Sequence, residues 1–119
     1  IEKCQVTMSD NVGILLGGGT SGKVVDCLVI NTDGVPIYVD APKSIVTGCE
    51  VVGGNYGLFV GATGDNSVFS SCNQKDASTN SVYISAGASG IVLSGLRIDG
   101  TTSFLTIPGA IAAVDSTAF

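Results

Sequence analysis

Four cysteines recur along this chain of 119 residues at nearly equal intervals. Cys4, Cys27, Cys49 and Cys72 are separated by 23, 22 and 23 residues, and a further step of 24 residues reaches Leu96. Self-similarity at a fixed period of this size is the sequence signature of a fold built from stacked repeats. Each repeat of such a fold contacts mainly its neighbours, so the content of one repeat decides the architecture.

Apolar residues keep the same period as the cysteines. Three residues before each anchor position stand Ile1, Val24, Val46, Phe69 and Leu93, and two residues after it stand Val6, Val29, Val51, Gln74 and Ile98. A second pair recurs as Ile14 and Leu16, Ile37 and Val39, Leu58 and Val60, Val82 and Ile84, and Leu105 and Ile107. A spacing of two residues places both side chains on one face of a strand. Gln74 is the one break in these columns, and we expect it at a distorted turn.

Turn residues separate these strand segments, and helical periodicity is absent. The chain contains 17 glycines, with clusters at 17–22 and 53–54. Glycine supplies the positive φ angles of tight turns, whereas each interior helical glycine costs about 1 kcal/mol relative to alanine. A period of 22–24 residues made of short strands and turns predicts an all-β solenoid of parallel strands, with about 4–5 coils.

The segments GCEVVGGNYGLFV and DCLVINTDGVPIYV resemble consecutive coils of the pectate-lyase-like superfamily. The resemblance covers residues 1–107 and implies a right-handed single-stranded parallel β-helix. Within that superfamily, the high Ser, Thr and Gly content and the short coils look most like the shaft of a bacteriophage tailspike or tail fibre. Residues 108–119 leave the repeat, and we expect them to form a tail of the same domain that crosses to another surface or caps the last coil.

The cysteines favour a structural role over a chemical one. Their spacing, in a chain without histidine, excludes the usual zinc frameworks. Cysteines stacked on adjacent coils point the same way, so their Cβ vectors do not converge as a disulfide requires. We therefore predict a reduced interior ladder and no metal or cofactor. The glycine-rich stretch at 17–23 approaches a nucleotide-binding loop, but the strand-like residues 24–30 follow it where a helix is required, so it is predicted to be a turn.

Carboxylates are the candidates for catalysis. Asp10 and Asp33 both lie six residues after their anchor cysteine, and Asn55 continues their column. Glycoside hydrolysis uses two carboxylates, which stacked coils could hold at the required separation. Asp and Asn also favour turns because they bond their own backbone. The column therefore predicts either a pair of catalytic acids, Asp10 and Asp33, or a braced turn.

Tyrosines are the candidates for ligand contact. Tyr38 and Tyr83 each lie between two inward-facing residues and should point outward, while Tyr56 lies in a turn beside Asn55, which is a further candidate for ligand contact. Exposed tyrosines offer an apolar ring and a polar tip, and their ring faces could stack on sugars or on neighbouring subunits. Outward apolar residues at 35, 38, 59, 83 and 92 would extend this surface, with Phe59 beside Tyr38.

The net charge of −5, with five scattered Lys and Arg residues, excludes nucleic acid and anionic membranes as partners, and no apolar run is long enough to cross a membrane. Our first hypothesis is a piece of a phage tailspike or tail fibre, a rigid homotrimeric shaft that contacts host cell-surface polysaccharide, located in the virion tail or outside the cell. The first alternative is part of a polysaccharide lyase or glycoside hydrolase. The second is a bacterial surface adhesin.

Overall fold

The computed structural model describes residues 1–8, 11–19, 21–31, 33–76, 78, 80–85, 87–99, 103–106 and 111–118. Regular structure in these residues consists of strands alone. Among them, no helix is long and apolar enough to cross a membrane. The strands are β1 (Gln5–Met8), β2 (Val12–Leu16), β3 (Lys23–Val25), β4 (Leu28–Asn31), β5 (Val35–Val39), β6 (Ile45–Thr47), β7 (Glu50–Gly53), β8 (Tyr56–Val60), β9 (Val68–Ser70), β10 (Asn73–Lys75), β11 (Asn80–Ile84), β12 (Ile91–Asp99), β13 (Ser103–Thr106) and β14 (Ile111–Ala118).

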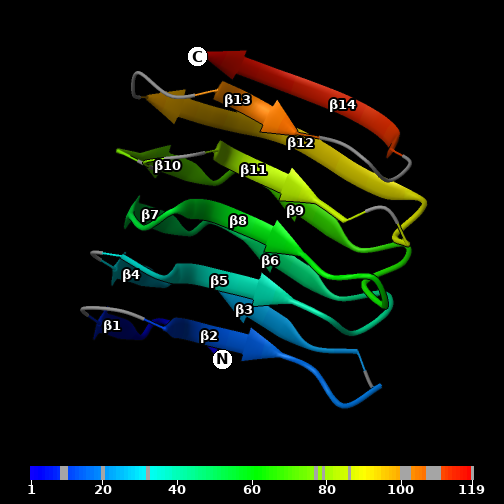
Figure 1. Ribbon diagram of the computed structural model, residues 1–119, viewed down its shortest axis with the longest axis horizontal. Coiled ribbons are helices and arrows are strands. Elements are labelled where there is room, and N and C mark those ends of the chain that lie inside the picture. Colours follow the sequence, from blue (N-terminus) through cyan, green and yellow to red (C-terminus); the bar gives the residue numbers. More distant parts are fainter. Residues whose placement is uncertain are drawn as a thin grey trace.

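The strands recur in threes and stack in parallel from one coil to the next. One sheet has the order β1-β4-β7-β10-β12-β9-β6-β3, with β14 also beside β12, and the other has the order β2-β5-β8-β11-β13. Figure 1 shows the coils stacked in sequence order, with the second sheet in front. The predicted all-β solenoid of parallel strands is confirmed.

A left-handed backbone residue precedes every anchor position. These residues are Lys3, Asp26, Gly48, Ser71 and Gly95, with φ between 52° and 68°. Such a residue turns the chain sharply within one position, and Asn, Asp and Gly tolerate the conformation best. The corner lets the residue three before the anchor and the residue two after it both face the interior.

The predicted columns form the core of the solenoid. The inward residues of the second sheet whose side chains the structure describes are buried, from Leu16 at 8% exposed to Ile37 and Val82 at 0%. Cys27, Cys49 and Cys72 are also buried, and all four cysteines are free thiols. Each thiol donates to the carbonyl oxygen two residues before it, at 3.3–3.4 Å. The reduced interior ladder is thus confirmed for three cysteines.

Cys4 differs from the other cysteines because it is exposed. It lies directly before β1, which pairs with a neighbouring coil on one side only, through β4. Its backbone N–H donates to the sulfur of Cys27 at 3.4 Å, so the residue still follows the ladder.

The prediction that Gln74 lies at a distorted turn is wrong. Gln74 lies within β10 in register with Val51 and Ile98, and it is 1% exposed. Its Nε2 donates to the carbonyl oxygen of Lys75 at 2.9 Å, whereas Oε1 is buried with no hydrogen-bond partner among the described residues. Gly57 makes room for this side chain, because a Cβ there would overlap with Cγ of Gln74. An amide can therefore occupy the interior without bending the strand.

The end of the chain adds to the same solenoid. Leu105 in β13 pairs with Val82, as the repeat predicts, while Ile107 and Pro108 lie outside the described residues. Strand β14 pairs in parallel with β12, with several shifts in register. Its backbone therefore lies beside β12 of the last coil.

Candidate functional site

Four aromatic side chains gather on the outer face of the second sheet. Tyr38 in β5, Phe59 in β8 and Tyr83 in β11 are register partners on successive coils. Tyr56 packs beside them, and the prediction that it lies in a turn is wrong, because it is the first residue of β8. Ring centroids are 4.7 Å apart between Tyr38 and Phe59 and 4.8 Å apart between Phe59 and Tyr83, with interplanar angles of 26° and 16°. All four are half-buried, so the predicted outward orientation of Tyr38 and Tyr83 is confirmed. We call these four residues the aromatic strip.

The rings of the strip stack on one another, which limits how a ligand can meet them. Both faces of Phe59 are covered by tyrosines, and Tyr56 packs against Phe59 and Tyr83 at 5.3 and 5.2 Å. Each such aromatic pair contributes about 0.5–1.5 kcal/mol beyond the area it buries. A sugar therefore cannot stack on the faces of Phe59, and a ligand would meet ring edges and tyrosine hydroxyls.

The hydroxyl of Tyr38 lies in a partly polar setting. Burial, followed by the negative charge of Asp40, raises the pKa of Tyr38 above its ordinary value. Asp40 itself accepts hydrogen bonds from Thr63 on the next coil, at 2.6 Å from Oγ1 and 3.2 Å from the backbone nitrogen. The phenol is therefore neutral at pH 7, and it can donate as well as accept a hydrogen bond.

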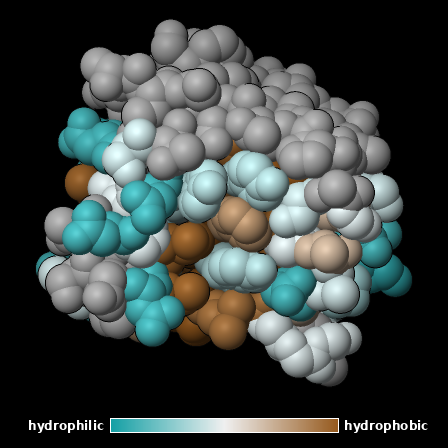
Figure 2. Space-filling model, viewed as in Figure 1, coloured by the Kyte–Doolittle hydropathy of each residue, from teal (hydrophilic) through white to brown (hydrophobic). Residues whose placement is uncertain are grey.

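Leu15 continues the strip at its N-terminal end. It is the register partner of Tyr38 on the preceding coil and is 59% exposed, which is unusual for a leucine. Figure 2 shows the resulting surface, in which pale, tan and brown residues run up the middle of this face between teal margins. Val92, by contrast, lies in β12 of the other sheet and does not belong to this surface.

The column of Asp33 and Asn55 forms a braced turn. The side-chain amide of Asn55 donates to the carbonyl oxygen of Asp33 at 2.6 Å, and the hydroxyl of Ser78 donates to Oδ1 of Asn55 at 2.9 Å. Asn55, which follows Asp33 in the column on the next coil, thus links three coils through the two hydrogen bonds of its side-chain amide. Asp10 lies outside the described residues. Within the described ranges no group of three or more His, Cys, Asp or Glu side chains could hold a metal ion.

The glycine-rich stretch is a turn, as predicted. Gly18 and Gly19 have φ of 83° and 80°, and β3 begins at Lys23 where a nucleotide-binding loop would require a helix. Among the described residues, no helix N-terminus therefore lies at this loop.

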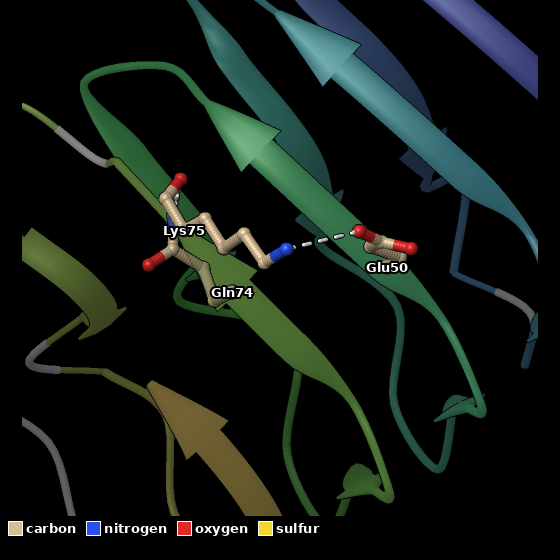
Figure 3. Close-up of polar contacts among 3 residues, drawn as sticks. All are labelled: Glu50, Gln74 and Lys75. Carbon is tan, nitrogen blue, oxygen red and sulfur yellow. Dashed lines mark hydrogen bonds and ion pairs between the residues drawn. The ribbon is translucent and has the colours of Figure 1, made fainter. Parts of the chain in front are cut away.

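One polar site was not predicted from the sequence. A cavity of about 160 Å³ lies where β10 and β12 pair, and it is lined by Asn73, Gln74, Lys75 and Arg97. Asn73 is the register partner of Arg97 on one side and of Glu50 on the other. Figure 3 shows Lys75 reaching from β10 to Glu50 on β7, where their charged groups are 3.5 Å apart. Asn73 and Arg97 each lie one residue after an anchor position, so the period could have indicated that they are neighbours.

Comparison with known proteins identifies the repeat. A family described as the right-handed β-helix region matches residues 1–106, nearly the whole of the repeat. No curated protein and no solved structure matches the chain.

Proposed function

Because this chain belongs to the right-handed β-helix family, we propose that it is a rigid scaffold that binds an extended cell-surface polysaccharide along its aromatic strip. The observation that carries the proposal is the half-exposed ladder of Tyr38, Phe59 and Tyr83, with Tyr56 beside it. The finer proposal, from the resemblance to tailspikes, is that the scaffold belongs to a phage tail and that the polysaccharide coats the host bacterium.

The strip suits a ligand that itself repeats. Its rings are placed by strand register, so each coil presents the same kind of group at the same spacing along the axis. Their rotamers are held by mutual stacking, and a site on regular strands loses little freedom when a ligand binds. Three tyrosine hydroxyls and apolar ring edges match the hydroxyls and C–H faces of a sugar chain.

Binding is favoured over catalysis by the state of the candidate acids. A lyase or hydrolase needs carboxylates that face a substrate, usually as a pair. Asp33 lies in a turn braced by Asn55, and Asp40 is bonded to Thr63. Both carboxylates thus belong to turns, where Asp is common for structural reasons.

The test is binding of purified bacterial surface polysaccharides, first on an array and then by titration calorimetry. Tyr38→Phe and Tyr83→Phe keep the stack but remove one hydroxyl each, and each should weaken binding about 3- to 10-fold. Phe59→Leu should weaken it further because it breaks the ladder. Ile45→Thr is the control, since it removes an exposed apolar side chain from the other sheet. Equal affinity of wild type and Phe59→Leu would overturn the proposal.

A subunit interface is the second candidate for the same surface. The exposed Leu15 extends the strip into a continuous apolar column, and such columns are commonly covered by another chain. We propose a homotrimer as the alternative occupant. Light scattering behind a sizing column, over a range of concentrations, decides between the two. A mass of three chains that drops in Phe59→Asp places the strip in an interface, whereas a monomer leaves it free for a ligand.

A further inference from the structure

We propose that the stacked thiols of Cys49 and Cys72 form a binding site for a soft metal ion that takes two ligands in a line, such as Cu(I) or Hg(II). The pair lies inside the solenoid and shares no residue with the aromatic strip, so it is independent of the proposed function. The cysteine spacing in the sequence excluded the usual zinc frameworks, which need four ligands. A two-coordinate ion needs only one pair of neighbouring thiolates, the ligand type that soft ions prefer.

The two thiols occupy the same position on adjacent coils. Glu50 and Asn73, each one residue after its cysteine, are register partners in β7 and β10. The backbone N–H of Asn73 also donates to the carbonyl oxygen of Cys49 at 2.9 Å. The two cysteines are therefore separated by one strand spacing, about 4.7–4.9 Å. Their thiols are close enough to share a hydrogen bond.

This spacing fits a bridging ion better than a disulfide. The sulfur atoms of a disulfide are about 2.0 Å apart and its Cβ atoms about 3.8 Å apart, which is closer than parallel side chains on neighbouring strands lie. A thiolate–zinc bond is about 2.3 Å long, and two bonds of that length in a line span about 4.6 Å. The stacking of the coils thus holds the two sulfur atoms near the separation that a linear ion requires.

Binding of the ion exchanges protons for metal. Each thiol must lose its proton to become a ligand, and the released protons pass to water. The hydrogen bond with Cys72 lowers the pKa of Cys49 to about 7, although burial opposes this change. The same hydrogen bond, together with burial, raises the pKa of Cys72. Cys49 is thus the first thiolate, and the metal ion replaces the Cys72 proton between the two sulfur atoms.

Burial selects the kind of ion. Cys49 and Cys72 are 2% and 1% exposed, and no group of three or more His, Cys, Asp or Glu side chains in the described ranges could hold a metal ion. Ions that require four or more ligands, such as zinc or calcium, therefore find no complete site at this pair. Two thiolates form a neutral unit with Hg(II), whereas Cu(I) leaves one negative charge in the apolar core, so Hg(II) should bind more tightly.

The experiment compares two double variants that carry the same number of thiols at different spacings. Cys4→Ala/Cys27→Ala keeps the neighbouring pair, whereas Cys4→Ala/Cys49→Ala leaves Cys27 and Cys72 two coils apart, about 9–10 Å, which is too far for one ion. Each full chain is refolded from denaturant with one equivalent of Hg(II), or of Cu(I) under reducing conditions, and is then dialysed against a competing small thiol. The first variant should retain one ion per chain about 100-fold more tightly than the second.

Retention of either ion by the first variant and its loss from the second supports the site. Equal retention by both variants, or retention of neither ion by the first, would overturn the proposal. X-ray absorption of the loaded wild type tests the site without any substitution: two sulfur ligands at about 2.3 Å support it, and any other ligand set overturns it. Tyr83→Phe, a variant of the aromatic strip, should leave metal retention unchanged, so failure of the proposed function would not affect this result.

Discussion

Replacing Gln74 by methionine should stabilise the protein. The side chain is 1% exposed within an apolar column, and its Oε1 has no partner in the described structure. A buried acceptor without a partner costs about 1–3 kcal/mol. Methionine has a similar length and flexibility, so it can fill the space over Gly57.

The net gain is smaller than that cost, because the substitution also removes a hydrogen bond. The bond from Nε2 to the carbonyl oxygen of Lys75, 2.9 Å long, has a net value of about 0.5–1.5 kcal/mol. We therefore expect the free energy of unfolding to rise by about 1 kcal/mol. A change of that size raises the melting temperature by about 4 °C for a domain of this length.

Urea unfolding followed by circular dichroism measures this gain. The midpoint should rise while the m-value, which reports the surface exposed on unfolding, stays constant. Gln74→Glu is the first control, because it buries a charge in the same volume and should destabilise the protein. Val51→Gln is the second, because it places an unpaired amide one coil away in the same column and should cost stability.

A double-mutant cycle tests the same geometry. Gly57→Ala should destabilise the wild type, since the new Cβ overlaps with Gln74, but should be better tolerated beside Gln74→Val. A lower midpoint for Gln74→Met at constant m-value would refute the reasoning, because it would mean that Oε1 is satisfied in solution.

Four further predictions concern single residues of the coils. Gly34→Ala should cost about 3 kcal/mol or more in urea unfolding, because its Cβ would overlap with backbone of the preceding coil, whereas Gly17→Ala meets only a side chain and should change stability little. One thiol, that of Cys4, should react with a thiol reagent in the folded protein and all four in denaturant; rapid reaction of two or more in the folded state would contradict the buried ladder. Folding raises the pKa of Tyr38, so the neutral side chain stabilises the protein fully below the unfolded pKa of 10.0. This stabilisation is lost as the pH rises through the folded pKa. The free energy of unfolding should therefore fall less at high pH in Tyr38→Phe than in the wild type. Asp40→Asn should lower the pKa of Tyr38 in a tyrosinate absorbance titration, and an unchanged titration would contradict the assigned cause.

The period of the sequence was enough to predict the fold and most of its core. Residues such as Val24, Ile37 and Leu58 recur at fixed offsets, and in a solenoid an equal offset means an equal place in the next coil. The same offsets correctly predict that Tyr38 lies beside Phe59 on the next coil. The prediction failed for Gln74, because its polarity was interpreted as the sign of a turn. The space that accommodates the buried amide is provided by Gly57, which lies on another strand of the preceding coil.

The candidate sites were harder to predict than the fold. Stacking of the rings depends on side-chain torsions, so the sequence could place the tyrosines outward but could not show that their faces are covered. The cavity depends on residues that are unremarkable one by one and become a site only when β10 and β12 pair. The period predicts that these residues are neighbours, but it does not predict the space between their side chains.

The left-handed residue before each anchor position sets the corner of its own coil. Because each corner is set by a single residue, with φ between 52° and 68°, the place where a coil turns does not depend on distant sequence. Duplication of one whole repeat would therefore insert a complete rung between existing ones and leave the rungs on both sides in register. Such an insertion would lengthen the aromatic strip by one position without disturbing the core, so a protein of this architecture can adjust the reach of its binding surface by gene duplication alone.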